Sequence, residues 1–210
     1  SRAPAWSVFF VSKFIDIKCI STFHGTYNFR GYLKKLYNSV MLRMNGTIAI
    51  SNFIRDHIKK NYGFKRNTIH TIERGIDLNF FDPKSISKND IKNAIKKYDL
   101  KEDSIKILLP ARVTEWKGHL ILVDAVSQLL EKKILNIEVL FFGPDQNKLL
   151  KEKIENSIRH KNLQHIIKFY GPTNKMNLIY ALSDIVISSS TDPEAFGRVS
   201  IEAQAMGKLI

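Results

Sequence analysis

The chain has 210 residues, of which 44% are hydrophobic and 25% are charged, and its formal net charge is +13. This composition supplies enough apolar side chains for a buried core and excludes a chain that is disordered through low hydrophobicity. The single cysteine, Cys19, excludes an internal disulfide and a cysteine-rich metal site. No apolar run reaches the roughly 18 residues that a membrane-spanning helix needs.

The positive charge is concentrated in the first half of the chain. Residues 1–100 hold 18 Lys/Arg and 7 Asp/Glu, whereas residues 101–210 hold 15 and 13, so the two net charges are +11 and +2. Such a surface favours an anionic partner, for which nucleic acid, an anionic membrane face and a phosphorylated acceptor are all candidates. The simpler interpretation is a solvated basic surface with no partner.

In chain order, the first half is predicted to alternate helices and strands. The predicted helices cover 4–14, 32–44, 52–61 and 91–98, and the predicted strands cover 18–23, 46–50 and 67–72. Ser51 stands where an N-cap of the third helix would lie. Along the second helix, the spacing of apolar residues predicts one buried stripe made of Leu33, Leu36, Tyr37, Val40 and Met41. A polar stretch at 79–90 reads as a linker, and the domain boundary is predicted at 100–103.

The second half has a clearer pattern. Four apolar strands are predicted at 105–109, 137–142, 166–170 and 184–188, with helices at 118–133, 146–160, 174–183 and 199–206. Strands that are apolar throughout, rather than alternating, are typical of parallel sheets covered on both faces. The alternation of strand and helix predicts a doubly wound α/β domain, which binds ligands at the carboxyl ends of its strands.

Two of these strand ends carry groups suited to an anion. Arg112 and Lys117 follow the strand at 105–109 and would form a clamp for a diphosphate, although two solvated cations are the simpler alternative. After the strand at 184–188, Glu194 and Glu202 flank a Phe196–Gly197 turn that enters a helix. Helix N-termini hold phosphates, and the carboxylates can accept hydrogen bonds from hydroxyl groups beside them.

One histidine and the absence of two motifs also bear on the chemistry of the predicted site. His24 ends the strand at 18–23, where it would either reach a sugar or an acceptor or simply cap the strand. The sequence has no Asp-x-Asp pair for a metal-bound nucleotide sugar and no phosphate-binding Gly-x-x-x-x-Gly-Lys-Ser/Thr loop. The charge of a leaving diphosphate would then be balanced by Arg112, Lys117 and backbone N–H groups rather than by a metal.

Taken together, these residues resemble the family 4 retaining glycosyltransferases of the GT-B fold. Six stretches match in the order found in that family, at 1–6, 22–25, 74–77, 111–118, 169–171 and 194–207. The resemblance implies an α/β protein of the GT-B type with two Rossmann-like domains of parallel sheet, both incomplete here. Residues 1–100 would form a partial acceptor-side domain with its linker, and residues 101–210 a nucleotide-sugar-binding domain without its last elements.

The resemblance also implies roles for residues that would bind the donor. Arg112 and Lys117 would hold the diphosphate, together with the backbone N–H groups of Phe196 and Gly197. Glu202 would hold the ribose hydroxyls. The loop at Tyr170 would lie near the base.

Two further residues would act on the transferred sugar. Glu194 would face it and stabilise its developing positive charge, and His24 would contact it near the reacting carbon. The expected reaction moves a sugar from a UDP- or GDP-sugar to a hydroxyl with retention, without a metal or another cofactor.

The expected setting follows from the same resemblance. The acceptor would be a glycan or a lipid-linked glycan in lipopolysaccharide or other cell-surface synthesis, in the cytoplasm or peripherally on the inner face of an anionic membrane. The alternative is a catalytically inactive fragment, truncated at both ends, that keeps nucleotide or partner binding. The interpretation as a nucleic-acid-binding module rests only on the basic charge, since the sequence contains no recognised nucleic-acid-binding motif.

Overall fold

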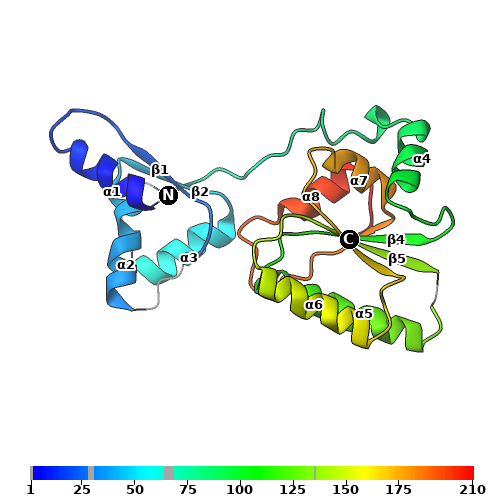
Figure 1. Ribbon diagram of the computed structural model, residues 1–210. Coiled ribbons are helices and arrows are strands. Elements are labelled where there is room, and N and C mark those ends of the chain that lie inside the picture. Colours follow the sequence, from blue (N-terminus) through cyan, green and yellow to red (C-terminus); the bar gives the residue numbers. More distant parts are fainter. Residues whose placement is uncertain (1, 28–30, 64–68, 135) are drawn as a thin grey trace. The chain divides into compact units, whose positions relative to one another are not determined.

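The computed structural model describes residues 2–27, 31–63, 69–134 and 136–210, and the chain forms two compact units (Figure 1). Unit 1 comprises Ser1–Gly75 and Glu194–Phe196, and unit 2 comprises Ile76–Pro193 and Gly197–Ile210. Each unit is built around its own parallel sheet. Among the described residues, no helix has both the length and the apolar character needed to cross a bilayer.

Unit 1 has three parallel strands in the order β1-β2-β3. The strands are β1 (Ile20–Phe23), β2 (Gly46–Ala49) and β3 (Ile69–Thr71). Around them lie α1 (Arg2–Val11), α2 (Tyr32–Ser39), the 3₁₀ turn η1 (Val40–Arg43) and α3 (Asn52–Tyr62). As predicted, Ser51 caps α3 by accepting a hydrogen bond from the N–H of Ile54 at 3.2 Å. Of the strand predicted at 67–72, the first two residues lie outside the described residues.

The predicted buried stripe along residues 32–44 is only partly correct. Val40 and Met41 are buried, but Leu33 is 79% exposed, and Leu36 and Tyr37 are exposed as well. The reason is that the α-helix ends at Ser39 and the chain tightens into η1, which breaks the helical period. The carbonyl of Met41 accepts hydrogen bonds from the hydroxyls of two sheet residues, Ser21 and Thr47, so the turn rather than α2 enters the core.

Unit 2 has a four-stranded parallel sheet in the order β6-β5-β4-β7. The strands are β4 (Ile105–Pro110), β5 (Ile137–Phe142), β6 (Ile167–Tyr170) and β7 (Ile185–Val186). The helices are α4 (Lys88–Lys97), α5 (His119–Glu131), α6 (Lys148–His160), α7 (Met176–Leu182) and α8 (Arg198–Ala205). Short 3₁₀ turns lie at η2 (Pro83–Ser85) and η3 (Glu115–Lys117). The four predicted strands and their parallel pairing are confirmed.

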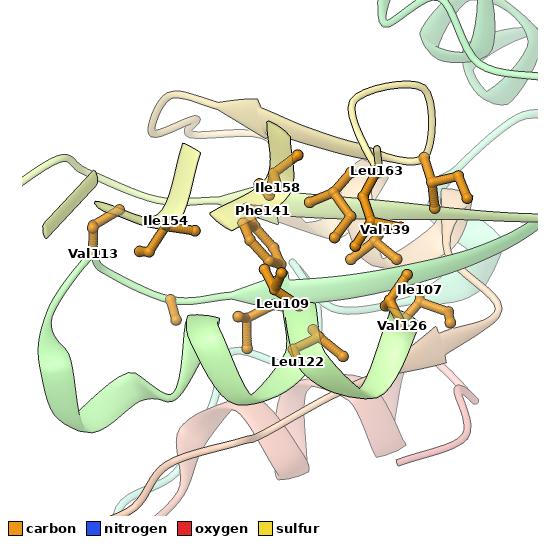
Figure 2. Close-up of a cluster of buried hydrophobic side chains, with 14 of the residues drawn as sticks. Ile107, Leu109, Val113, Leu122, Val126, Val139, Phe141, Ile154, Ile158 and Leu163 are labelled. Atoms are coloured by element: carbon orange, nitrogen blue, oxygen red, sulfur yellow. The ribbon is translucent and has the colours of Figure 1, made fainter. Parts of the chain in front are cut away.

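Both faces of this sheet are covered, which explains why its strands are apolar throughout (Figure 1). Alternate residues of β4 and β5 point to opposite faces. Leu109 and Phe141 pack with side chains of α5 and α6 on one face (Figure 2). Leu108 and Leu140 pack with side chains of α7 and α8 on the other.

The two units divide at Gly75–Ile76, earlier in the chain than the boundary predicted at 100–103. Three residues between these points belong to the core of unit 2. Phe81, Ala94 and Leu100 are buried there, and the ring of Phe81 meets that of Tyr180 edge to face at 5.8 Å. A polar, Pro-containing stretch therefore looks like a linker in sequence but is anchored by a few apolar side chains.

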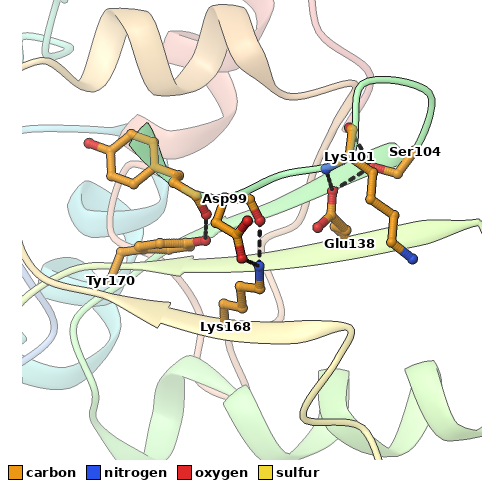
Figure 3. A network of polar contacts seen from close by, with 7 residues as sticks. Asp99, Lys101, Ser104, Glu138, Lys168 and Tyr170 are labelled. Atoms are coloured by element: carbon orange, nitrogen blue, oxygen red, sulfur yellow. Dashed lines mark hydrogen bonds and ion pairs between the residues drawn. The ribbon is translucent and has the colours of Figure 1, made fainter. Parts of the chain in front are cut away.

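A network of polar contacts lies at the amino ends of β4 and β5 (Figure 3). Glu138 is 2% exposed and accepts hydrogen bonds from the Lys101 N–H at 2.8 Å and the Ser104 hydroxyl at 2.6 Å. Its neighbour Lys106 donates to the carbonyl of Ser104 at 2.9 Å. These buried charges have partners within the fold, so this edge of the sheet serves stability.

Candidate active site

The strand order of unit 2 creates a topological switch point between β4 and β7. From β4 the chain moves outward through β5 to β6 and then returns to place β7 on the other side of β4. The loops leaving β4 and β7 therefore start side by side at the carboxyl edge. In open α/β sheets this is where ligands bind.

Direct hydrogen bonds join these two loops. The Thr191 N–H donates to the carbonyl of Trp116 at 2.8 Å, and the Ser189 hydroxyl donates to the carbonyl of Lys117 at 2.9 Å. The two segments are more than 70 residues apart in sequence. They form one continuous surface of loop backbone at the switch point.

Gly118 makes this close approach possible. Its φ is +69°, and a Cβ atom built on it would lie 1.9 Å from the carbonyl oxygen of Ser189. A side chain would therefore separate the two loops, and the left-handed backbone would be strained as well. The glycine of the motif at 111–118 thus has a structural reason.

Both predicted cations lie in the loop after β4. Arg112 is exposed, and its guanidinium is 3.4 Å from the side-chain oxygen of Gln146, in the loop after β5. The Lys117 ammonium is 3.5 Å from the Ser190 hydroxyl and lies 4.0 Å from the centre of the Trp116 ring. The loop therefore extends one cation toward the loop after β5 and the other toward the loop after β7.

Glu202 is held by two neighbouring side chains. It lies on α8, is 9% exposed, and is bound on both carboxylate oxygens. The Tyr180 hydroxyl donates to Oε2 at 2.9 Å, and the Arg198 guanidinium contacts Oε1 at 2.7 Å. The sequence alone had assigned no role to Tyr180 or Arg198. The signal for Arg198 was present, because a residue four positions before Glu202 on a helix lies on the same face.

A cavity of about 500 Å³ opens beside Glu202 and Arg198. Its other walls come from the segment after the unit boundary, the loop after β6 and the start of α7, and they include Asp77, Phe80, Asn174 and Met176. A second cavity, of about 340 Å³, lies beside the first turn of α5. Neither cavity is lined by Arg112 or Lys117. Glu202 and the two cations are thus on one unit but border different parts of its surface.

The other predicted residues are divided between the units. Gly197 begins α8 with φ +75° and belongs to unit 2, whereas Glu194 and Phe196 are grouped with unit 1. His24 follows β1 in unit 1, where burial and then the charge of Arg74 lower the pKa of its imidazole. A neutral imidazole can both donate and accept hydrogen bonds.

Tyr170 has a structural role at the end of β6 (Figure 3). Its hydroxyl donates to the carbonyl of Tyr98 at 2.9 Å, and its ring stacks on Phe142 with centroids 4.6 Å apart. Burial, followed by the nearby carboxylate of Glu138, raises the pKa of its phenol to about 12. The hydroxyl is therefore already engaged within the fold. Among the described residues, no group of three or more His, Cys, Asp or Glu side chains is placed to hold a metal ion.

Two α/β units, each with its own parallel sheet, are the fold of the GT-B glycosyltransferases. Comparison with protein-family models agrees: residues 90–210 match the model of glycosyl transferases group 1, and residues 1–80 match that of glycosyltransferase family 4. The chain belongs to the glycosyl transferases group 1.

Similar proteins of known structure or sequence include several glycosyltransferases. A glycosyltransferase from Rickettsia africae ESF-5 is 40% identical with a TM-score of 0.88, covering 100% of this chain and 55% of its own. Anabaena Alr3699/HepE in complex with UDP-glucose is 21% identical with a TM-score of 0.87, covering 99% and 56%. A D-inositol 3-phosphate glycosyltransferase from Xylanimonas cellulosilytica is 27% identical over 80% of this chain and 40% of its own length. The chain thus spans about half the length, or less, of these proteins.

Proposed function

We propose that the chain transfers a sugar from a nucleotide-diphosphate sugar to a hydroxyl acceptor, with retention and without a metal. The observation that carries this proposal is the pair of hydrogen-bonded loops at the β4–β7 switch point, which holds Lys117 beside Ser190 and leads on to α8. A nucleotide diphosphate is the ligand class that this kind of crevice binds in related α/β folds.

In this proposal the donor is held mainly by unit 2. Arg112 and Lys117 bind the diphosphate, and the backbone N–H groups of Phe196 and Gly197 add to the clamp at the start of α8. Glu202 accepts hydrogen bonds from the ribose hydroxyls. Because the Tyr170 hydroxyl is bonded to Tyr98, contact with the base is assigned to the loop that follows it.

Two further residues act on the transferred sugar. Glu194 stabilises the positive charge that develops as the bond to the diphosphate breaks, and His24 contacts the sugar hydroxyls. The leaving phosphate assists attack from the same face of the sugar, which retains its configuration. The transition state has the oxocarbenium character known from glycoside chemistry.

Binding and transfer are best measured separately. Isothermal titration calorimetry with UDP, GDP and ADP tests binding, and a panel of UDP- and GDP-sugars tests transfer. Replacing Lys117 by Gln should weaken binding of the preferred diphosphate about 10- to 100-fold, because one charge-assisted contact is lost. Glu202→Gln should weaken it by a similar factor through the ribose.

Matched controls lie at the far end of α5, where Lys132→Gln and Glu131→Gln change the same charges on exposed positions. These variants should bind as the wild type does. Equal binding by all four variants would contradict the proposed site. Nucleotide binding without transfer from any donor would support the alternative of an inactive chain that keeps its nucleotide site.

A lipopolysaccharide 1,2-N-acetylglucosaminetransferase of Salmonella typhimurium is 27% identical over 63% of this chain and 36% of its own length, which supports a role in cell-surface glycan synthesis. Cytoplasmic location and docking of the basic first half on an anionic membrane stay predictions. Sedimentation with phosphatidylserine vesicles checks the docking, which high salt should abolish.

A further inference from the structure

The carboxylate of Glu202 has one fixed protein donor on each oxygen. Tyr180, on α7, occupies Oε2 at 2.9 Å, and Arg198, one helical turn before Glu202, occupies Oε1 at 2.7 Å. Each oxygen of a carboxylate can accept two hydrogen bonds. One acceptor position therefore remains on Oε1 and one on Oε2.

Tyr180 is a rigid donor that stays protonated. Its side chain has no exposed surface, and its ring packs edge to face against Phe81. Burial, and next the neighbouring Glu202 carboxylate, raise the pKa of the phenol above its ordinary value, so the hydroxyl keeps its proton at any physiological pH. Because the ring cannot move without disturbing the core, the hydroxyl fixes where Oε2 lies.

Arg198 completes the arrangement from the solvent side. Its side chain is half exposed and lines the same cavity of about 500 Å³ as Glu202. Its charge offsets that of the carboxylate, which would otherwise repel a diphosphate bound at the start of the same helix. The cavity gives a ligand access to the side of Glu202 that Tyr180 does not cover.

We propose that Tyr180 and Arg198 are positioning residues that orient Glu202 to accept two adjacent hydroxyls, one on each oxygen. The ligand group that meets this demand is a cis-diol, as in the ribose of a nucleotide, and a deoxyribose fills only one of the two positions. The site selects ribonucleotides over deoxyribonucleotides because Tyr180 and Arg198 prevent the carboxylate from turning to satisfy a single hydroxyl. This inference rests on the proposed function, which places a nucleotide at Glu202.

The test is the ratio of two affinities rather than either affinity alone. Calorimetry with UDP, 2′-deoxy-UDP and 3′-deoxy-UDP should give a wild-type preference for UDP of about 10- to 100-fold over each deoxy analogue. Tyr180→Phe should lower that preference about 5- to 10-fold, since the freed carboxylate discriminates less. If Tyr180 had a purely structural role, Tyr180→Phe would weaken the binding of all three nucleotides by the same factor and leave the ratio of affinities unchanged.

Tyr98→Phe is the matched control, because it removes a tyrosine hydroxyl from a ring packed in the same core without touching Glu202. It should keep the wild-type ratio. If Tyr180→Phe does not fold, Arg198→Gln at its half-exposed position makes the same test. An unchanged ratio in a variant that still binds UDP overturns this inference alone, whereas a wild-type chain that binds no nucleotide overturns the proposed function and this inference with it.

Discussion

His119 is a buried histidine of unit 2. It is the first residue of α5 and is 2% exposed, and neither ring nitrogen has a hydrogen-bond partner among the residues that the structure describes. Its ring packs perpendicular to Phe141 and parallel to Phe169. Burial, and then the charge of Lys117, lower the pKa of its imidazole to about 4, so the folded chain holds it neutral.

This pKa predicts a loss of stability in acid. In the unfolded chain the imidazole has an ordinary pKa of about 6.5, so below that pH the unfolded chain binds a proton that the folded chain does not. The stability linked to His119 is therefore complete above pH 6.5 and is lost as the pH falls toward 4. His119→Phe should remove this dependence, worth about 3 kcal/mol at pH 4.

Urea unfolding of both proteins at several pH values between 7 and 4 measures this difference. His165→Gln is the control, because it removes a histidine from an exposed position of the same unit. It should leave the pH dependence as in the wild type. Parallel stability curves for the wild type and His119→Phe would contradict the prediction.

At the scale of elements, the site depends on how closely two loops approach. Gly118 stands against the carbonyl of Ser189, so the β4 and β7 crossovers share one surface. Adding a methyl group at this position forces the loops apart and strains a left-handed residue. Gly118→Ala should therefore lower the free energy of unfolding by about 2 to 4 kcal/mol.

The matching control is Gly171→Ala, since a Cβ at Gly171 would meet no atom within 4 Å. That variant should change the free energy of unfolding by less than about 0.5 kcal/mol. Urea titration followed by circular dichroism measures both. Equal stability of the two variants would show that the loops separate without cost.

At the scale of the whole molecule, the unit boundary has a measurable consequence. Residues 72–75 are exposed and in neither helix nor strand, whereas α4 and Leu100 are packed into unit 2. A protease cleaves exposed, unpaired backbone more readily than packed helix. Prolonged digestion with trypsin should leave a resistant fragment that begins at Gly75, after Arg74.

Mass spectrometry of the digest identifies the start of that fragment. If the resistant fragment instead began after Lys97 or Lys101, the boundary would lie where the sequence alone placed it, near residue 100. The Lys101 N–H is bonded to the buried Glu138, which is a further reason to expect protection there.

Local patterns predicted most of the secondary structure because each signal lies within a few residues. The continuous apolar runs at 105–109 and 137–142 required a sheet covered on both faces, and Ser51 marked the start of α3. The expected stripe from Leu33 to Met41 was partly wrong because a tight turn replaced the end of the helix. The spacing of apolar residues does not show where an α-helix ends and a 3₁₀ turn begins.

By itself the sequence determined the class of fold, the placing of Arg112 and Lys117 after a strand, and the positions of the two glutamates around α8. Only the tertiary structure decided that β7 returns to the side of β4, that Gly118 meets Ser189, and that Tyr180 holds Glu202. These features join residues far apart in the chain. Strand order and core contacts depend on how whole elements pack, and no short stretch of residues encodes that packing.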